Sequence, residues 1–498
     1  MNPIPVEFCG DGPARYLQLA MAIRRAIKTG ELSPGMKLSS ARTMAQAYAL
    51  NRHTVMNALQ ILVAEGWLES QERSGYRVTH SLPIDSSLRP DLTLSKHRTV
   101  AVAERYQTRN FNWPIVYAAQ ASLSLSDYRY NFAGGLPDLA EFPFDEFKRA
   151  LGSACQRLDT RLLHYGEVSG VPDLKAQITA YLAKARGLVA NELLICNGSQ
   201  EALFLIAKAF IAQGACIAVE TLGYPPARKA FIACGASLVD IRQDEYGLCV
   251  EDLAKQLRVH PIKLLYLTPL HQYPTTVTLS MTRRMQIYQL CYEHGVAIIE
   301  DDYDHEFHYR CQPIAPMASD DPAGIVIYVA TFSKLMFAGA RLGYIVCSDS
   351  IMSQLTALKQ LVNHKNDVLT QLGVAQWMKE GGFERHAKRM TKLYKNNYQH
   401  LDRLLQAYQA QGYPIRYDKP DGGMAMWVDM GVNVNQLKEK AKLSGVYVQT
   451  QSEFYFEHSM RSLRGDASQY THIRLGFAGQ SPDMLAKGLQ IIIDILYE

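Results

Sequence analysis

A lysine lies between two apolar runs in the stretch YVATFSKLMFAGARLGYIV, which covers residues 328–346. Lys334 stands at the point where a buried strand is expected to turn. The charge of a buried lysine is costly to desolvate unless it is paired or neutralised. The sequence therefore marks the amine of Lys334 as a candidate for chemistry.

Four carboxylates end another apolar run, in IIEDDYDHEF. Glu300, Asp301, Asp302 and Asp304 have the types of a magnesium site or of a solvated acidic turn, but nothing nearby indicates a nucleotide-binding loop. The alternative is that one carboxylate at the strand end bonds a protonated ring nitrogen. Pyridoxal phosphate (PLP) needs such a carboxylate together with a lysine that holds it as a Schiff base.

Two features are suited to a phosphate group. The segment ICNGSQEALFLIAKAF predicts a strand, a turn and a helix, so backbone N–H groups at the helix start and the hydroxyl of Ser199 would form an anion cup. Most turns of this kind are only helix caps. Arg341 follows Lys334 by seven residues, where its guanidinium could neutralise a phosphate.

The elements that must position these residues alternate along the chain from about residue 130 onward. Buried strands are predicted at 264–269, 296–302, 324–334 and 340–348, with amphipathic helical segments between some of them. This order is typical of an α/β fold with a mainly parallel sheet. Ligands of such folds bind at the carboxyl ends of the strands, where the candidate residues stand.

The first 80 residues predict a different unit. They hold nine Lys and Arg against six Asp and Glu, most of the net charge of +4. Three helices and a two-stranded wing are predicted, the third helix carrying an apolar stripe of Val55, Leu59 and Leu62. This is a winged helix-turn-helix, although a small helical interaction module has a similar pattern. The residues that the third helix turns outward are Arg52, His53, Asn57 and Gln60.

Composition limits the remaining possibilities. Residues 81–128 are polar and proline-containing at first, as expected of a linker between a domain at 1–80 and one at 129–498. The nine cysteines show no C-x-x-C pair, which favours a reducing cytoplasm and argues against disulfides or a zinc site. No apolar run is long enough for a membrane span, and no signal peptide is evident.

Residues 10–80 resemble the GntR family of bacterial DNA-binding domains, through GELSPGMKLSSARTMA, NRHTVMNALQILVAEGWL and SGYRV. The family usually has proline at Ser39 and an acidic residue at Ala41. The resemblance implies double-stranded promoter DNA as the partner, with Arg52 suited to guanine. The residues that it assigns to DNA binding are Arg42, Arg52, His53, Thr54, Asn57, Arg73 and Gly75.

Residues from about 130 to 498 resemble the fold-type I, aspartate-aminotransferase-like PLP enzymes, through HYGEVSGVPDLKAQITAYLAKARG, NGSQEAL, ETLGYPP, LTPLHQYPTT, IIEDDYDHEF, TFSKLMFAGARLGY and IRLGFA. With the GntR-like segment, the chain resembles a MocR-type transcriptional regulator. By that resemblance Lys334 forms the Schiff base with PLP, and Arg474 grips the carboxylate of an effector. The other residues implied for PLP are Asp301 at the pyridinium nitrogen, Tyr303 at the phenolic oxygen, Tyr224 stacked on the ring, and Ser199, Gln200, Thr331, Ser333, Arg341 and the partner subunit's Tyr165 around the phosphate.

Two positions depart from the aminotransferase pattern. Tyr273 replaces an asparagine that contacts the ring oxygen in those enzymes, and Thr276 replaces a glycine. The first change counts against efficient transamination more than against PLP binding. The sequence thus predicts a regulator that senses an amino acid, an amine or PLP itself by aldimine exchange at Lys334. By analogy with the fold, a head-to-tail dimer is expected. A working aminotransferase with an appended DNA-binding module is the alternative.

Overall fold

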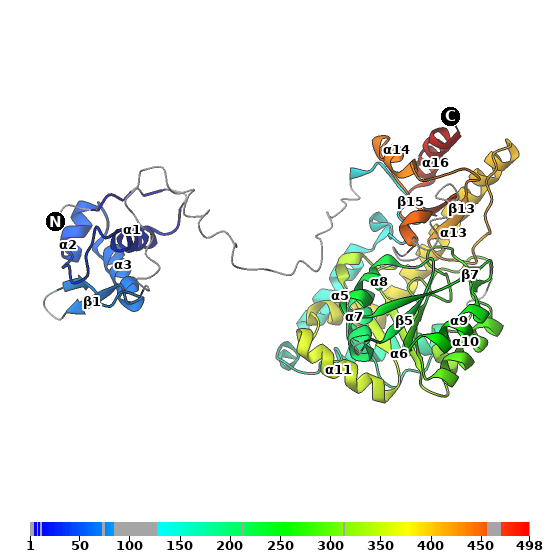
Figure 1. Cartoon of the computed structure of the whole chain (residues 1–498), viewed down its shortest axis with the longest axis horizontal. Coiled ribbons are helices and arrows are strands. Elements are labelled where there is room, and N and C mark those ends of the chain that lie inside the picture. Colours follow the sequence, from blue (N-terminus) through cyan, green and yellow to red (C-terminus); the bar gives the residue numbers. More distant parts are fainter. Residues whose placement is uncertain are drawn as a thin grey trace. The chain divides into compact units, whose positions relative to one another are not determined.

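The computed structural model describes residues 4–6, 8–9, 12–71, 75–83, 127–211, 214–311, 314–455 and 470–497. The chain divides into two compact units, Met1–Ala121 and Ser122–Glu498. Each unit has a hydrophobic core of its own. Figure 1 shows both units and labels their elements.

The smaller unit has the predicted winged helix-turn-helix order. Apolar side chains from all three helices fill its core, among them the fully buried Leu19, Ile23 and Leu59. The first helix ends at Gly30, which adopts the left-handed conformation that glycine tolerates. The elements are α1 (Arg15–Thr29), α2 (Ala41–Ala47), α3 (Arg52–Ala64), β1 (Leu68–Gln71) and β2 (Gly75–Val78).

Capping side chains fix where α2 and α3 begin. The Ser40 hydroxyl accepts a hydrogen bond from the Thr43 amide, at 3.1 Å. The side-chain oxygen Oδ1 of Asn51 accepts a hydrogen bond from the His53 amide at the start of α3, at 2.9 Å. β1 and β2 pair antiparallel as the wing. The predicted wing tip at Arg73 lies outside the described residues.

The larger unit is built on a seven-stranded sheet in the order β4-β12-β11-β10-β9-β5-β6. β12 runs antiparallel to both of its neighbours, and the other pairings are parallel, so the mainly parallel sheet predicted from the sequence is confirmed. Its strands are β4 (Leu194–Cys196), β5 (Cys216–Glu220), β6 (Ser237–Ile241), β9 (Ile262–Leu267), β10 (Ala297–Asp301), β11 (Val326–Thr331) and β12 (Gly343–Val346).

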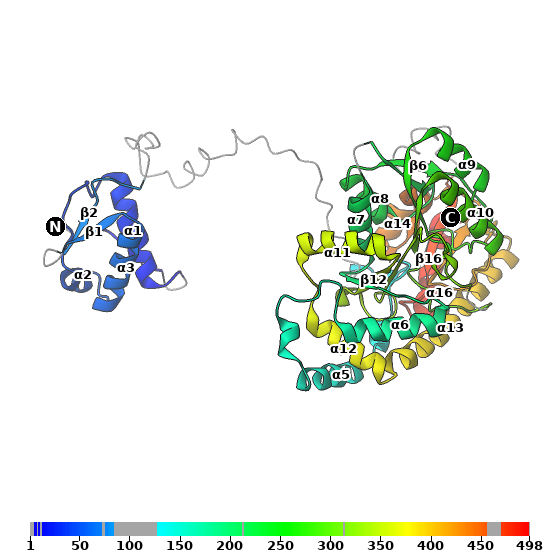
Figure 2. The same cartoon turned by 90° about the horizontal axis from the view of Figure 1, so that it is seen from below.

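Helices cover both faces of this sheet, because almost every strand residue is apolar and buried. One face packs against α7, α8 and α11 through residues such as Val219 and Ile299. The opposite face packs in part against α9 and α10 through residues such as Ala218 and Ile298. Figure 2 shows the helices around the sheet. The helices of the larger unit up to this point are α5 (Phe144–Gln156), α6 (Pro172–Arg186), α7 (Ser199–Phe210), α8 (Pro225–Ala233), α9 (Val250–Val259), α10 (Met281–His294), α11 (Asp349–Asn363) and α12 (Val368–Lys379).

The C-terminal part of the unit adds a second, antiparallel sheet in the order β13-β16-β15. The 29-residue helix α13 leads into it from α12. None of the helices in the described part of the chain is long and apolar enough to cross a membrane. The remaining elements are β3 (Tyr130–Asn131), β7 (Gln243–Asp244), β8 (Gly247–Leu248), α13 (Gly382–Ala410), β13 (Ala425–Asp429), α14 (Leu437–Leu443), β14 (Val446–Tyr447), β15 (Gln449–Thr450), β16 (His472–Gly476) and α16 (Pro482–Tyr497).

Candidate functional site

A cavity lies at the carboxyl ends of the parallel strands, where folds of this class bind their ligands. Asp301 is the last residue of β10, and Lys334 follows the end of β11 by three residues. Ser199 is the first residue of α7, which follows β4 at the end of the sheet order. The residues around the cavity are Gly134, Gly135, Ser199, Tyr224, Tyr266, Thr268, Tyr273, Asp301, Tyr303, Lys334 and Arg474.

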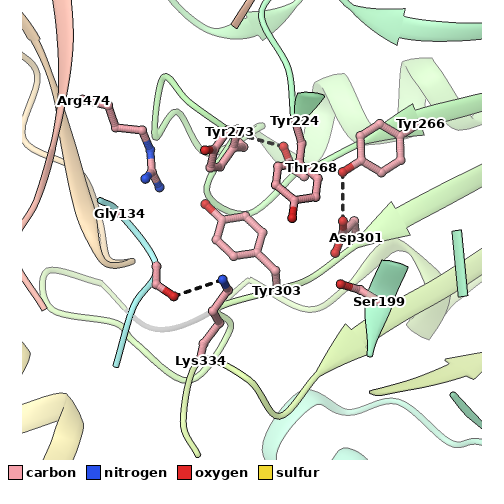
Figure 3. A pocket seen from close by; sticks show the side chains of 11 residues that line it. Gly134, Ser199, Tyr224, Tyr266, Thr268, Tyr273, Asp301, Tyr303, Lys334 and Arg474 are labelled. Atoms are coloured by element: carbon pink, nitrogen blue, oxygen red, sulfur yellow. Dashed lines mark hydrogen bonds between the residues drawn. The ribbon is translucent and has the colours of Figure 1, made fainter. Parts of the chain in front are cut away.

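Figure 3 shows Lys334 and Arg474 near the glycine loop, with Asp301, Tyr266 and Ser199 across the cavity. The Lys334 ammonium donates a hydrogen bond to the Gly135 carbonyl at 3.0 Å. Burial, and next the nearby charge of Arg474, lower the pKa of the Lys334 amine. A lowered pKa leaves more of the amine in its neutral, nucleophilic form.

Asp301 is a buried carboxyl with one free oxygen. Tyr266 donates its hydroxyl to Oδ2 at 2.8 Å, and Oδ1 has no hydrogen-bond partner in the described part of the chain. Burial raises the pKa of Asp301 to about 7. The site thus contains an acceptor that a cationic donor would satisfy.

The other carboxylates of IIEDDYDHEF point to different partners. Glu300 accepts the amides of Met317 and Ala318, and Asp302 pairs with Arg186 at 2.8 Å. Although burial alone would raise it, the Arg186 charge lowers the pKa of Asp302 to about 2. All four carboxylates are buried, so the solvated acidic turn considered from the sequence is wrong.

Of the residues predicted to surround the phosphate, only Ser199 is part of the cavity's described lining. Arg341 donates to the Asn197 carbonyl at 2.5 Å, next to the turn at Gly198. The hydroxyl of Thr331 lies 3.0 Å from that of Ser333. Gln200 instead donates to the Pro226 carbonyl at 2.9 Å.

The two tyrosines predicted to contact the PLP ring, Tyr303 and Tyr224, interact with other protein groups in this structure. Tyr303 donates its hydroxyl to the His271 carbonyl at 3.0 Å, and Tyr224 lies edge-on to Tyr273. Tyr165 is 90% exposed and does not line the cavity.

Sequence reasoning missed Tyr266 and Thr268, which both line the cavity. They lie in LLYLTP, which was predicted as a strand without any assignment of its side chains. Its polar residues near a carboxyl end were the available signal. It also missed the buried pair of His271 and Asp304, whose Nδ1 and Oδ1 atoms lie 2.7 Å apart.

The predicted DNA-contacting residues of the smaller unit lie at the start of α3 and on α2. Arg52 and His53 are exposed, Thr54 and Asn57 are partly exposed, and all four are in the first two turns of α3. Arg42 is exposed on α2, and Gly75 begins β2 with an exposed backbone.

We predict that replacing Asp301 by Asn changes how the stability of the cofactor-free protein depends on pH. The folded pKa of Asp301 is raised above its unfolded value, so its protonation favours the folded state. This contribution is fully present below about pH 4 and is lost as the pH rises through about 7. Denaturant unfolding from pH 4 to 8 should show the difference in unfolding free energy, wild type minus Asp301→Asn, falling as the pH rises. A difference in unfolding free energy that is constant over this range would contradict the raised pKa of Asp301.

Both units match known protein families. Residues 131–492 match the family described as "Aminotransferase class I and II", and residues 15–78 match "Bacterial regulatory proteins, gntR family". The second match implies that the smaller unit binds DNA.

Similar proteins include regulators and enzymes. The chain is 30% identical to the "Probable rhizopine catabolism regulatory protein MocR" of Rhizobium meliloti, over 82% of this chain and 80% of that protein. It is 26% identical to the pyridoxine biosynthesis transcriptional regulator PdxR of Corynebacterium glutamicum, over 76% of each. The crystal structure of a multiple substrate aminotransferase from Thermococcus profundus superposes with a TM-score of 0.70, at 25% identity, over 78% of this chain and 97% of that chain.

The aminotransferase family implies PLP as the cofactor, and the residues present fit it. The free oxygen of Asp301 suits a pyridinium N–H, and the unpaired Nε and Nη1 of Arg474 suit an anion. The start of α7 and Arg341 supply backbone N–H groups and a cation for a phosphate. On its two matched domains and its regulator relatives, the chain belongs to the MocR-type regulators of the GntR family, with an aminotransferase class I and II domain.

Proposed function

We propose that the PLP pocket of this regulator senses a primary amine or amino acid, and that occupancy of the pocket changes binding to promoter DNA in the cytoplasm. The observation that carries the proposal is the burial of the Lys334 amine in a cavity that also holds Asp301 and Arg474. PLP itself is a second candidate signal.

The residues of the pocket divide the work among them. PLP, when bound, supplies an aldehyde carbon that takes up primary amines. Lys334 anchors the cofactor through its amine, and Asp301 holds the ring nitrogen in its protonated form. Arg341 and the amides at the start of α7 hold the phosphate, together with Ser199, Gln200, Thr331 and Ser333. Arg474 binds the carboxylate of an amino-acid effector.

The tyrosines complete this assignment. Tyr224 would cover the ring, and Tyr303 would donate its hydroxyl to the ring oxygen in place of its present bond to the His271 carbonyl. Both side chains line the cavity, which supports the assignment. They exclude water from the space in which an amine must reach the cofactor.

The smaller unit reads DNA through α3. Arg52 would contact a base edge in the major groove, while Arg42, His53, Thr54, Asn57 and Gly75 position the unit on the backbone. Arg73, at the predicted wing tip, completes the set. The exposed start of α3 supports this arrangement.

The domain organisation is part of the proposal: a DNA-binding domain at 1–80, a linker at 81–128 and a PLP domain at 129–498. The division into two compact units near residue 121 supports two domains of this size. A linker between them would let the DNA-binding domains respond to the PLP domains without a shared rigid core.

We also infer a homodimer, with the head-to-tail arrangement that the fold resemblance implies. An exposed patch, which we call the Tyr165 patch, supports an interface; it consists of Leu163, Tyr165, Leu361, Val362 and His364. Tyr165 and Leu361 are 90% and 85% exposed. The rings of Tyr165 and His364 lie 5.4 Å apart, and Lys365 donates to the Leu162 and His164 carbonyls, so the two segments form one surface. Contiguous exposed apolar groups of this kind mark interaction sites.

The alternative function is a working aminotransferase with an appended DNA-binding module. The set of Lys334, Asp301 and Arg474 favours it, because these residues suffice for at least a half-reaction. The regulator relatives and Tyr273 favour sensing. A screen of primary amines against the absorbance of bound PLP, followed by DNA-binding assays with each hit, separates the two functions. Sustained turnover with a keto-acid acceptor would favour the enzyme.

We predict that Lys334→Ala removes the covalent adduct that borohydride traps between the protein and PLP. The variant lacks the only amine in the cavity's described lining, so no covalent link can form. Mass spectrometry of the reduced protein checks this. The matched control is Lys148→Ala, which removes an exposed lysine on α5 outside the cavity and should keep the adduct. An adduct that persists in Lys334→Ala would show that Lys334 is not the residue that binds PLP covalently.

We predict that Arg52→Ala abolishes binding to the promoter beside its own gene, while PLP binding persists. At low salt, where binding becomes measurable again, the loss of one phosphate or base contact should also lower the slope of log affinity against log salt by about one. Fluorescence anisotropy at several salt concentrations measures both effects. Arg25→Ala removes the same charge from an exposed position on α1 and serves as the control. Unchanged affinity and salt slope for Arg52→Ala would show that α3 does not read DNA.

We predict that Leu361→Asp shifts the protein from dimer to monomer, because a carboxylate in the Tyr165 patch must be desolvated at the interface. Analytical ultracentrifugation reads the mass. Leu443→Asp is the control, since Leu443 is 89% exposed but lies outside the patch. The assignment fails if Leu361→Asp keeps the wild-type mass, or if wild type is already monomeric.

A further inference from the structure

Arg474 carries a buried charge without a carboxylate partner in the described residues. Its side chain is on β16, the central strand of the antiparallel sheet, and the residue is 1% exposed. Nε and Nη1 have no hydrogen-bond partner among the residues that the structure describes. A buried guanidinium in this state is costly, so something other than a carboxylate must hold it in place.

The ring of Tyr273 is the group against which this guanidinium lies. The Arg474 Cζ atom is 4.4 Å from the ring centroid, well within the range of a cation–π interaction. Such an interaction is strongest where both groups are removed from water. The guanidinium also fills the place of a side chain on Gly134, whose Cβ would be 1.5 Å from Nη1.

Tyr273 is itself held in one orientation by its surroundings. Its amide donates to the Thr268 hydroxyl at 2.9 Å. Its ring meets those of Tyr224, Tyr303 and Phe454 edge-on, with centroids 5.2, 6.2 and 5.6 Å away. Figure 3 shows Arg474 and Tyr273 facing the same cavity as Lys334. The ring is therefore a fixed platform and not a side chain that adapts to the arginine.

We propose that Tyr273 is a positioning residue for Arg474 and thereby sets the preference of the pocket for amines that carry a carboxylate. This inference rests on the proposed sensing function and adds the residue that selects the ligand class. The ring face holds the guanidinium without using its N–H donors. Two of these donors, Nε and Nη1, stay free to bind a carboxylate.

A carboxylate preference is measured by comparing amines that differ only in that group. Three pairs serve: glycine with methylamine, 3-aminopropanoate with ethylamine, and 4-aminobutanoate with propylamine. For each pair, the absorbance of PLP bound to the full-length protein gives two dissociation constants at equilibrium. Their ratio, amine over amino acid, reports the contribution of the carboxylate. The pair with the largest ratio in the wild type is used for all variants.

Variants at position 273 separate the ring face from the hydroxyl. Tyr273→Phe keeps the ring and should stay within about twofold of the wild-type ratio. Tyr273→Leu removes the ring and should lower the ratio about tenfold, the size expected of a desolvated cation–π contact. Tyr273→Met is a second variant without a ring, for use if the leucine variant does not fold. Arg474→Met should bring the ratio close to one, and adding Tyr273→Leu to it should change nothing further.

Three results would overturn the proposal. The first is a wild-type ratio near one for all three pairs. The second is a ratio in Tyr273→Leu and Tyr273→Met within twofold of the wild type, while Arg474→Met lowers it. The third is a loss in Tyr273→Phe as large as that in Tyr273→Leu, which would assign the effect to the hydroxyl. Failure of the sensing function is separate, because it leaves these ratios intact and shows only as unchanged DNA binding.

Discussion

The desolvation of charge at one end of the sheet is the constraint on which the site depends. Lys334 and Asp301 are both removed from water. Burial lowers the pKa of Lys334 and raises the pKa of Asp301, so it favours the neutral form of each group. Lys334 and Asp301 do not form an ion pair with each other in the part of the chain that the structure describes. Asp301 has one free oxygen, and Lys334 is held by a backbone carbonyl. A ligand with a cationic ring nitrogen and an electrophilic carbon satisfies both groups at once.

The rest of the larger unit maintains this arrangement. β10 and β11 pair in parallel, so their carboxyl ends bring Asp301 and the Lys334 turn to the same edge. The neighbouring Asp302 is anchored on the other side by Arg186 and Tyr328, which fixes the backbone that carries Asp301. His386 on α13 hydrogen-bonds the Leu335 carbonyl and holds the turn after Lys334. These contacts hold Asp301 and Lys334 in their buried positions, although burial of the two groups is unfavourable.

Much of this could be predicted from the sequence because it depends on local patterns. Strand ends followed by polar residues identified Asp301, Ser199 and Lys334, and the apolar stripe of Val55 and Leu59 placed α3. The orientation of Tyr273 toward Arg474 could not be predicted, since it depends on a contact between segments far apart in the chain. The same holds for Tyr266, whose place in a strand says nothing of which carboxylate it meets.

The exposure of Tyr165 could not be predicted either, because no local pattern around this residue indicates whether it is buried. Only the family resemblance implies that Tyr165 acts in the site of a partner subunit, and this stays a prediction. How the two compact units influence each other could not be predicted either. Their sequences identify a DNA-binding module and a PLP domain, whereas the coupling between the two is a free energy that no local pattern encodes.

Reciprocity gives the most direct test of this coupling. If an amine in the pocket changes the affinity for promoter DNA, the DNA must change the affinity for the amine by the same factor. The measurement is the dissociation constant of the best amine from the screen, read from the absorbance of bound PLP, with and without saturating promoter DNA. We expect the two constants to differ by at least about fivefold, the lower end of typical allosteric coupling. Identical constants, with DNA shown to be bound, would contradict the claim that this pocket controls DNA binding.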